Sequence, residues 1–272
     1  MRLFVRHTTK YRYDQPLANS MQQIRLTPAN GAAQTIVDWS IDTQGIARAT
    51  TYTDAFENVV HMVSRTGPVE DVEITAVGTV ETSDTHGVLG NEPDASAPPR
   101  IYKRVTPLTQ SNQAIRKLAS LAEDENQLDG FHALMHAIRE KVDYKIGVTE
   151  THASASSALT AGEGVCQDHA HIFIAAARAI DIPARYVSGY LHLEDEQESE
   201  AHHAWAEVLI SDLGWVGFDV SNGICPTDRY IRLTTGLDSR SAAPIKGIRF
   251  GGHEENLTVE VDVTQAASQQ QQ

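Results

Sequence analysis

The sequence predicts an α+β protein in which a strand-rich first third precedes a region of helices and a small antiparallel sheet. Residues 1–85 alternate apolar and polar side chains between turn residues. Residues 112–142 and 166–180 instead carry apolar residues at helical spacing, and residues 184–220 return to strand patterns. Because strands and helices are segregated along the chain, an α+β class is favoured over an alternating α/β class.

The first 85 residues predict an antiparallel β-sandwich-like domain. Alternating segments at 23–26, 35–41 and 69–80 are separated by Gly, Pro and Asn clusters, as is typical of such domains. Two isolated histidines, His7 and His61, stand among polar residues, and we expect structural or surface roles for them.

A linker and a catalytic core are expected to follow. Residues 86–100 are rich in Gly, Pro and Asp, which marks a domain boundary. The core is assigned to residues 101–264, with helices starting near Ser111 and Asp129 and strands at its C-terminal end. The tail 265–272, QAASQQQQ, is of low complexity and is expected to be disordered.

Cys166 lies at the predicted start of the helix around which the core is organised. The tight entry Gly162-Glu163-Gly164 precedes it, the apolar run follows, and Pro183 ends the run. Unpaired N–H groups and the helix dipole favour an anion at this position, and a cysteine thiolate is such an anion. The alternative is a small buried cysteine without chemistry. Asp168 is expected to cap or hydrogen-bond the helix start.

The segment 202–220 predicts a hairpin that brings a histidine and a carboxylate together. Pairing 203–208 with 214–219 places His203 opposite Asp219 and puts Trp205 on the same face, while the other face is uniformly apolar. Directly opposed side chains lie about 4.5–5.5 Å apart at Cβ, which permits an imidazole–carboxylate hydrogen bond. His202 points to the apolar face in this register, so a buried or edge role is expected.

Metal sites are the competing interpretations of these residues. A zinc cluster of His169, His171, His202 and His203 is disfavoured because C-x2-H-x-H matches no common zinc spacing. A calcium site in the acidic stretch 193–200 is disfavoured because the stretch lacks the ligand alternation of a calcium loop. We therefore expect no metal and no cofactor. Cys225, before Pro226, is expected to be a spectator.

Composition excludes several classes of partner. The net charge of 22 − 36 = −14 argues against binding to nucleic acid or anionic membranes, since both require basic surfaces. Only two cysteines occur in 272 residues, which favours a reducing compartment. The N-terminus lacks the apolar core of a signal peptide, and we expect a cytoplasmic protein.

Three motifs together resemble those of the transglutaminase-like superfamily. They are GVCQDHAHIFIAAARAIDIPARYVSGYL, HAWAEV and GWVGFDV, and residues 1–80 and 229–263 resemble the bacterial branch with an N-terminal β domain, whose members are described as cysteine proteases. The resemblance implies a papain/transglutaminase-like core in which the nucleophile helix packs on an antiparallel sheet. It also implies Cys166 as the nucleophile, His203 as the general base and acid, and Asp219 as the carboxylate that orients the histidine.

The resembling family also sets expectations for the reaction. Gln167 and Tyr144 are candidates for a second oxyanion donor, and Trp205 for a supporting residue. Hydrolysis of a peptide or amide bond is favoured; the alternatives are a protein-glutamine transglutaminase or deamidase, or a non-catalytic binding module. A peptide or protein substrate is therefore expected. The family's G-R-D-Y-x-D-V-x-P segment reads GLDSRSAAP at 236–244, which leaves substrate preference open.

Overall fold

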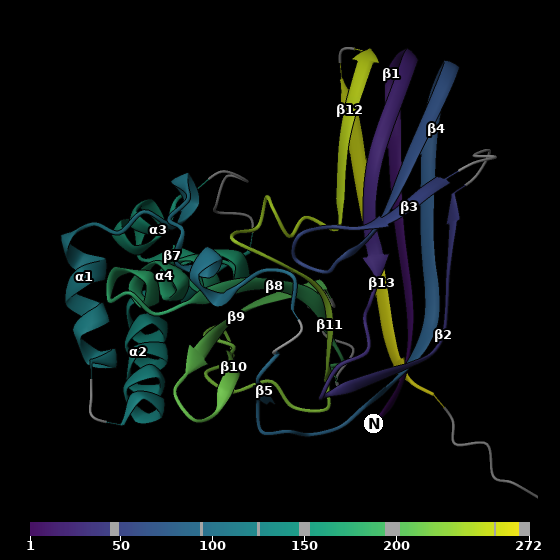
Figure 1. Cartoon of the computed structure of the whole chain (residues 1–272). Helices are drawn as coiled ribbons and strands as arrows, with labels where there is room; N and C mark the ends of the chain where they lie inside the picture. Colours follow the sequence, from purple (N-terminus) through teal and green to yellow (C-terminus); the bar gives the residue numbers. More distant parts are fainter. Residues whose placement is uncertain are drawn as a thin grey trace, which may run out of the picture.

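The computed structural model describes residues 1–43, 49–92, 95–123, 126–146, 153–193, 202–252 and 254–266. The predicted α+β class is confirmed: a sheet of long strands stands beside a core of helices on a second antiparallel sheet (Figure 1). The elements are, in chain order, β1 (Arg2–Thr27), β2 (Gln34–Thr43), β3 (Ala49–Thr53), β4 (Val59–Thr82), β5 (Val88–Gly90), η1 (Pro99–Lys103), η2 (Pro107–Thr109), α1 (Gln113–Ala119), η3 (Ser120–Ala122), α2 (Gln127–Lys141), β6 (Asp143–Tyr144), α3 (Ala155–Ala161), β7 (Glu163–Gly164), α4 (Cys166–Ala179), β8 (Ala184–Leu191), β9 (His202–Ile210), β10 (Gly214–Phe218), β11 (Tyr230–Gly236), β12 (Ile245–Gly251) and β13 (Glu255–Gln265).

The N-terminal region forms one continuous six-stranded antiparallel sheet. Its two long central strands, β1 and β4, pair with each other along most of their length. Strands β12 and β13 pair with the edge of β1 that faces away from β4. Strands β2 and β3 pair with the edge of β4 that faces away from β1. Register shifts in β1, one of them between Arg12 and Leu17, mark irregularities at which a long strand can bend. In place of the separate short strands expected of a sandwich-like domain, the two halves of this sheet share the same long strands, β1 and β4.

The last two strands differ from the domain boundaries expected from the sequence. The sequence assigns residues up to 264 to the core, but β12 and β13 complete the N-terminal sheet, where Leu3 pairs with Gln265. An open edge on β1 would leave its N–H and C=O groups unpaired, and the returning chain satisfies them. Gln265 is therefore strand rather than tail, and residues 267–272 lie outside the described residues.

The core is a five-stranded sheet in the order β11-β8-β9-β10-β5, with helix α4 packed on one face. The apolar side of β9, made by Ala204, Ala206 and Val208, packs in the same buried cluster as α4. The β8 and β11 side of this sheet meets the N-terminal sheet, where Tyr190 and Ile231 join its apolar cluster. Helix α4 is thus buried along most of its length, which fixes the position of its first residue.

Helices α1 and α2 begin at asparagines rather than at the residues expected from the sequence. Asn112 and Asn126 are the N-caps, and their side-chain oxygens accept hydrogen bonds from the N–H groups of Ile115 and Leu128. Asparagine ranks with aspartate and serine as an N-cap, so each predicted start is off by one to three residues.

The hairpin of β9 and β10 forms with a register two residues away from the predicted one. Gly214 pairs with Ile210 and Phe218 with Ala206. Continued by one residue, this register places Asp219 opposite Trp205 and diagonal to His203. Because side chains alternate with a period of two, a shift of two residues keeps every side chain on its predicted face. The predicted separation of a polar and an apolar face is therefore retained.

Candidate active site

Cys166 is the first residue of α4, as the sequence predicts. The Asp168 carboxylate accepts a hydrogen bond of 2.9 Å from the backbone N–H of Val165 and closes the helix start. The Cys166 side chain is half-buried, so it is held in place while one side remains accessible. It stands at the N-terminus of a 14-residue helix, where unpaired backbone N–H groups point towards its side.

Gly164 is required by the way Asp168 caps this helix. A Cβ atom at residue 164 would lie 2.8 Å from both Cβ and Oδ2 of Asp168. We expect Gly164→Ala to displace Asp168 and lower the free energy of unfolding by about 1–3 kcal/mol, since a lost N-cap alone costs about 0.5–2 kcal/mol. Urea unfolding measures the loss. Gly31→Ala is the matched control, because a Cβ at residue 31 meets no heavy atom within 4 Å; equal losses in the two variants would contradict the prediction.

His203 and Asp219 form a buried hydrogen-bonded pair. The distance from His203 Nε2 to Asp219 Oδ2 is 2.7 Å, and Asp219 is 0% exposed. Burial alone would raise the pKa of Asp219, but the hydrogen bond and positive charge of His203, with hydrogen bonds from Tyr230 and Asn222, hold it below its usual value. Asp219 is therefore an ionised carboxylate at neutral pH.

Cys166 completes the group by hydrogen bonding to His203. Burial opposes a charged imidazole, but hydrogen bonds to Asp219 and Cys166, together with their negative charges, raise the pKa of His203 to about 10. Since Asp219 occupies Nε2 of the ring, Nδ1 is the nitrogen left for the Cys166 sulfur. The three residues singled out by the sequence thus meet in one group.

The raised pKa of His203 predicts how stability depends on pH. Its pKa is about 10 in the folded protein, against an ordinary value of 6.5 for histidine, so the folded state holds the proton more tightly than the unfolded chain. The resulting stabilisation is fully present below about pH 6.5 and is lost as the pH rises towards 10. We expect the free energy of unfolding of wild type, relative to His203→Gln, to fall over this interval. Urea titrations at several pH values measure it; a difference that is constant with pH would contradict the expectation.

Two residues that the sequence did not single out hold the Asp219 carboxylate. The Tyr230 hydroxyl and the Asn222 amide donate to Asp219 Oδ2 at 2.7 and 2.6 Å. Burial and the charge of Asp219 raise the pKa of Tyr230, so its hydroxyl stays protonated and can donate. Only the spacing D-x-x-N hinted at Asn222, and no local pattern distinguishes Tyr230 from other strand tyrosines.

Trp205, Gln167 and Tyr144 are the supporting residues that the sequence predicts. The Trp205 ring stacks on the His203 ring with 6.5 Å between the ring centres and 28° between the ring planes. It meets the Tyr230 ring edge-on, with 5.5 Å between the ring centres. Gln167 follows Cys166 in α4 and is half-buried. Tyr144 is 38% exposed and pairs through its backbone with Gly164. Trp205 thus packs directly on the pair, whereas oxyanion donation by Gln167 or Tyr144 stays a prediction.

The rival histidines of α4 have structural partners. His169 lies 2.8 Å from the Ser221 hydroxyl and 2.9 Å from the Val142 carbonyl through its two ring nitrogens. His171 Nε2 accepts a hydrogen bond of 3.1 Å from the backbone N–H of Ser239, and burial lowers the pKa of His171 to about 4. Both ring nitrogens of His169 are thus bonded, whereas Nδ1 of His171 is buried with no hydrogen-bond partner among the described residues.

The remaining candidates of the sequence also lie away from the Cys166 group. His202 Nε2 is 2.9 Å from the Ser188 hydroxyl. His7 contacts Tyr190 and Thr9, and His61 contacts Thr27 and Thr51. Burial raises the pKa of the Cys225 thiol to about 11, and its sulfur lies 3.5 Å from His132. In the described ranges no three His, Cys, Asp or Glu side chains group as metal ligands; most of the acidic stretch, 194–200, lies outside those ranges.

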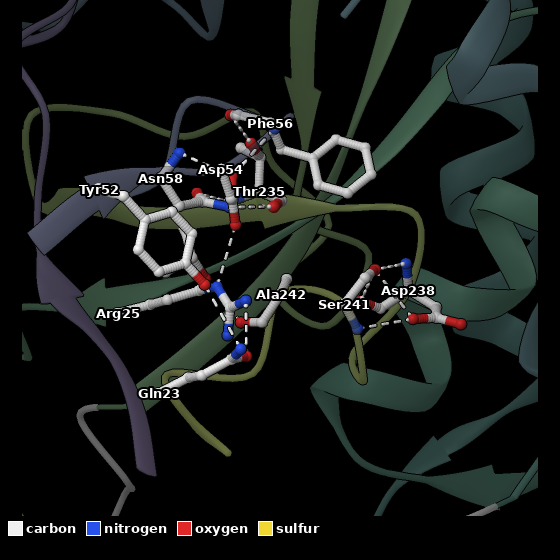
Figure 2. Close-up of polar contacts among 11 residues, drawn as sticks. Gln23, Arg25, Tyr52, Asp54, Phe56, Asn58, Thr235, Asp238, Ser241 and Ala242 are labelled. Carbon is white, nitrogen blue, oxygen red and sulfur yellow. Dashed lines mark hydrogen bonds and ion pairs between the residues drawn. The ribbon is translucent and has the colours of Figure 1, made fainter. Parts of the chain in front are cut away.

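The segment 236–244, whose sequence differs from the family's pattern, packs next to α4. Leu237 joins an apolar cluster with Tyr102 and Trp215, and Asp238 caps a turn with Ser241 (Figure 2). The segment reaches α4 through the bond of Ser239 to His171 described above.

None of the helices in the described part of the chain has the length and apolar character that a membrane span requires.

Comparison with known proteins identifies the family. Residues 115–220 match the family model of the transglutaminase-like superfamily, and residues 3–81 match that of the bacterial transglutaminase-like N-terminal region. An uncharacterized protein of Mycobacterium leprae, ML0607, is 30% identical over 284 residues, which cover 98% of this chain and 99% of the relative. An uncharacterized protein of Mycobacterium tuberculosis, Rv2569c, is 29% identical over 95% of this chain and 91% of the relative.

A solved structure shares the whole fold. The protein described as "a Putative Cysteine Protease from Cytophaga hutchinsonii" superposes with a TM-score of 0.78 at 22% identity, over 98% of this chain and 91% of that chain. At this identity the likeness concerns the fold. Taken with the two family matches and the full-length relative, it leads to one conclusion: the chain belongs to the transglutaminase-like superfamily, in the form that carries the bacterial N-terminal domain.

Proposed function

We propose that this protein is an enzyme that transfers acyl groups from amide substrates through Cys166. One observation carries the proposal: Cys166 at a helix N-terminus is hydrogen-bonded to His203, whose other ring nitrogen is bound by the buried carboxylate of Asp219. In this assignment Cys166 is the nucleophile, His203 the general base and acid, and Asp219 the group that orients the imidazole. The same division of labour operates in other nucleophile–histidine–carboxylate enzymes.

The reaction proceeds in two halves. The Cys166 thiolate attacks the amide carbonyl carbon, and the oxyanion is stabilised by the backbone N–H of Cys166 and a second donor, for which Gln167 and Tyr144 are the candidates. The imidazolium of His203 gives its proton to the leaving amine, and a thioester remains. An incoming nucleophile then gives a proton to His203, attacks the thioester and releases the Cys166 thiolate.

Hydrolysis, with water as the incoming nucleophile, is the proposed second half-reaction. The cysteine-protease description of the structural neighbour supports it. The substrate would be a peptide or protein, and we propose that the enzyme acts in the cytoplasm, which the two free cysteines support. The second candidate is transfer to an amine, giving transglutamination, or deamidation of glutamine; the superfamily's name supports it.

A peptide library separates these outcomes. The protein is incubated with the library, with and without a primary amine, and the products are read by mass spectrometry, with Cys166→Ala as the control. Cleaved peptides that require Cys166 support hydrolysis. Amine adducts or deamidated glutamines in place of cleavage overturn it in favour of the second candidate.

Alkylation of Cys166 tests whether the protein is an enzyme at all. Iodoacetamide at neutral pH should label Cys166 faster than a free thiol, and His203→Ala should remove the advantage. Labelling at the rate of a free thiol that is insensitive to His203→Ala would make a non-catalytic binding module the better description.

A further inference from the structure

Tyr230 links the Asp219 carboxylate to the edge strand of the core sheet. Its hydroxyl donates to Asp219 Oδ2 at 2.7 Å, and it is the first residue of β11. Strand β11 ends the five-stranded sheet, so among the described residues it has a strand partner only on its β8 edge. Its other edge lies on the side of the core that faces the N-terminal sheet (Figure 1). The groups that occupy this edge therefore decide how firmly Tyr230 is held.

Gln34 of the N-terminal sheet takes the place of a neighbouring strand at Arg232. Its Nε2 donates to the Arg232 carbonyl at 2.8 Å, and its Oε1 accepts from the Arg232 N–H at 2.8 Å. The same Nε2 donates to the Ala29 carbonyl at 2.7 Å, which ties the amide to its own region. Gln34 is buried, so losing either bond would leave a peptide group without a partner.

Residues of the N-terminal region also bind the chain on both sides of Arg232, at Asp228 and at Thr235. The Thr82 hydroxyl donates to the Asp228 carbonyl, and the N-terminal ammonium of Met1 lies 3.4 Å from the Asp228 carboxylate. At the other end, Asn58 repeats the arrangement of Gln34 on Thr235, donating to its carbonyl and accepting from its N–H at 2.9 Å (Figure 2).

The Asn58 contact is itself braced within the N-terminal region. Asp54 accepts hydrogen bonds from the Asn58 N–H and amide, and Arg25 Nε binds the same carboxylate at 3.0 Å. Figure 2 shows this chain of contacts running from Arg25 through Asp54 and Asn58 to Thr235. The grip on β11 is thus anchored in the long strands.

The seam between the two regions is not packed solid where these bonds lie. A cavity of about 340 Å³ is bordered by Gln34, Asn58, Arg232, Tyr230 and Trp205. Where apolar packing is interrupted, directional hydrogen bonds take a larger share in fixing backbone position. Tyr230 stands between residues 228 and 232, both of which are held from the N-terminal sheet.

We propose that the N-terminal sheet is a positioning element for the reaction. By binding Asp228, which precedes β11, and residues 232 and 235 within β11, it holds Tyr230, and through Tyr230 the Asp219 carboxylate that orients His203. Gln34 and Tyr230 are the positioning residues of this path. The inference rests on the proposed function for its consequence in catalysis, but the coupling between the sheet and the His203–Asp219 bond can be measured without a substrate.

The test combines a spectroscopic and a kinetic measurement on the full chain. The low-field proton resonance of His203 Nε2–H, hydrogen-bonded to Asp219, is recorded by NMR, and the alkylation rate of Cys166 by iodoacetamide is measured in parallel. We expect Gln34→Met to shift or broaden the resonance and slow alkylation about 3- to 10-fold, and Tyr230→Phe to slow it about 10-fold, the size expected for single hydrogen bonds. Gln22→Met is the matched control, since Gln22 is buried in β1 and pairs through its backbone with Val63 and Gly247 inside the N-terminal sheet.

The outcomes are decisive in either direction. A changed resonance in Gln34→Met and Tyr230→Phe with a wild-type resonance in Gln22→Met supports the proposal; an unchanged resonance in folded Gln34→Met overturns it. If Gln34→Met does not fold, Thr82→Val, which removes the hydroxyl bond to Asp228, is measured instead, and an unchanged resonance there also overturns it. If wild-type Cys166 reacts no faster than a free thiol while the resonance responds as expected, the proposed function fails and the positioning path stands.

Discussion

His203→Ala is expected to lower turnover of any amide substrate by about 10²–10⁴-fold, the usual contribution of a general acid–base group. Two losses combine in this variant. In the proposed mechanism Cys166 loses the imidazole hydrogen-bonded to it, and the leaving amine loses its proton donor. The buried Asp219 carboxylate also loses its partner at 2.7 Å, so some loss of stability should accompany the kinetic effect.

The neighbouring histidine provides a matched control for this prediction. His202 differs by one position and binds the Ser188 hydroxyl on the other face of the strand, so His202→Ala should leave the rate within a few-fold of wild type. The measurement is the rate of product formation for a peptide identified by the library screen, made on protein verified as folded by circular dichroism. Equal losses in the two variants would mean that the strand as a whole, not the His203 side chain, matters.

Arg185→Met is expected to lower the free energy of unfolding by about 3–5 kcal/mol, because it removes the buried guanidinium that pairs with the buried Glu207 carboxylate. Arg185 is 2% exposed; its Nε binds Glu207 at 2.6 Å, and its two terminal nitrogens bind the Glu92 carboxylate at 2.7 and 2.9 Å. Its guanidinium also lies 3.9 Å from the Trp215 ring centre, a cation–π contact. Glu207 is 1% exposed, and the half-buried Arg232, at 3.1 Å, is the ion-pair partner that would remain to it in the variant.

We expect Arg185→Met to loosen the linker between the two regions as well as the core sheet. Glu92 belongs to the linker, so Arg185 ties that segment to β8 and β9. Urea unfolding should show the loss. The control is Lys103→Met, which removes an ion pair of 2.7 Å with Asp181, a residue 85% exposed in its side chain. Exposed pairs contribute about 1 kcal/mol or less, so similar losses in the two variants would show that burial of the network is not what stabilises it.

Local patterns in the sequence were sufficient for the parts of the site that depend on local structure. The glycine entry and the apolar run placed Cys166 at a helix start because helix boundaries follow neighbouring residues. The alternation of β9 and β10 put His203, Trp205 and Asp219 on one face, and this assignment survived a register shift of two residues because strand side chains repeat every two residues. The link between Cys166 and the hairpin came from resemblance to the family.

Only the tertiary structure decided which distant residues hold that site together. Tyr230 reaches Asp219 from 11 positions away, and Gln34 reaches β11 from 198 positions away. Likewise, β12 and β13 returned to the N-terminal sheet because the open edge of β1 needed partners, a requirement that no residue within 245–265 expresses. The sequence by itself thus determined the candidate residues of the site and the helix start or strand face that each occupies, because these follow from periodicity and short-range capping. The positions of the supporting side chains follow from how sheet edges meet in space, which is a property of the folded chain as a whole.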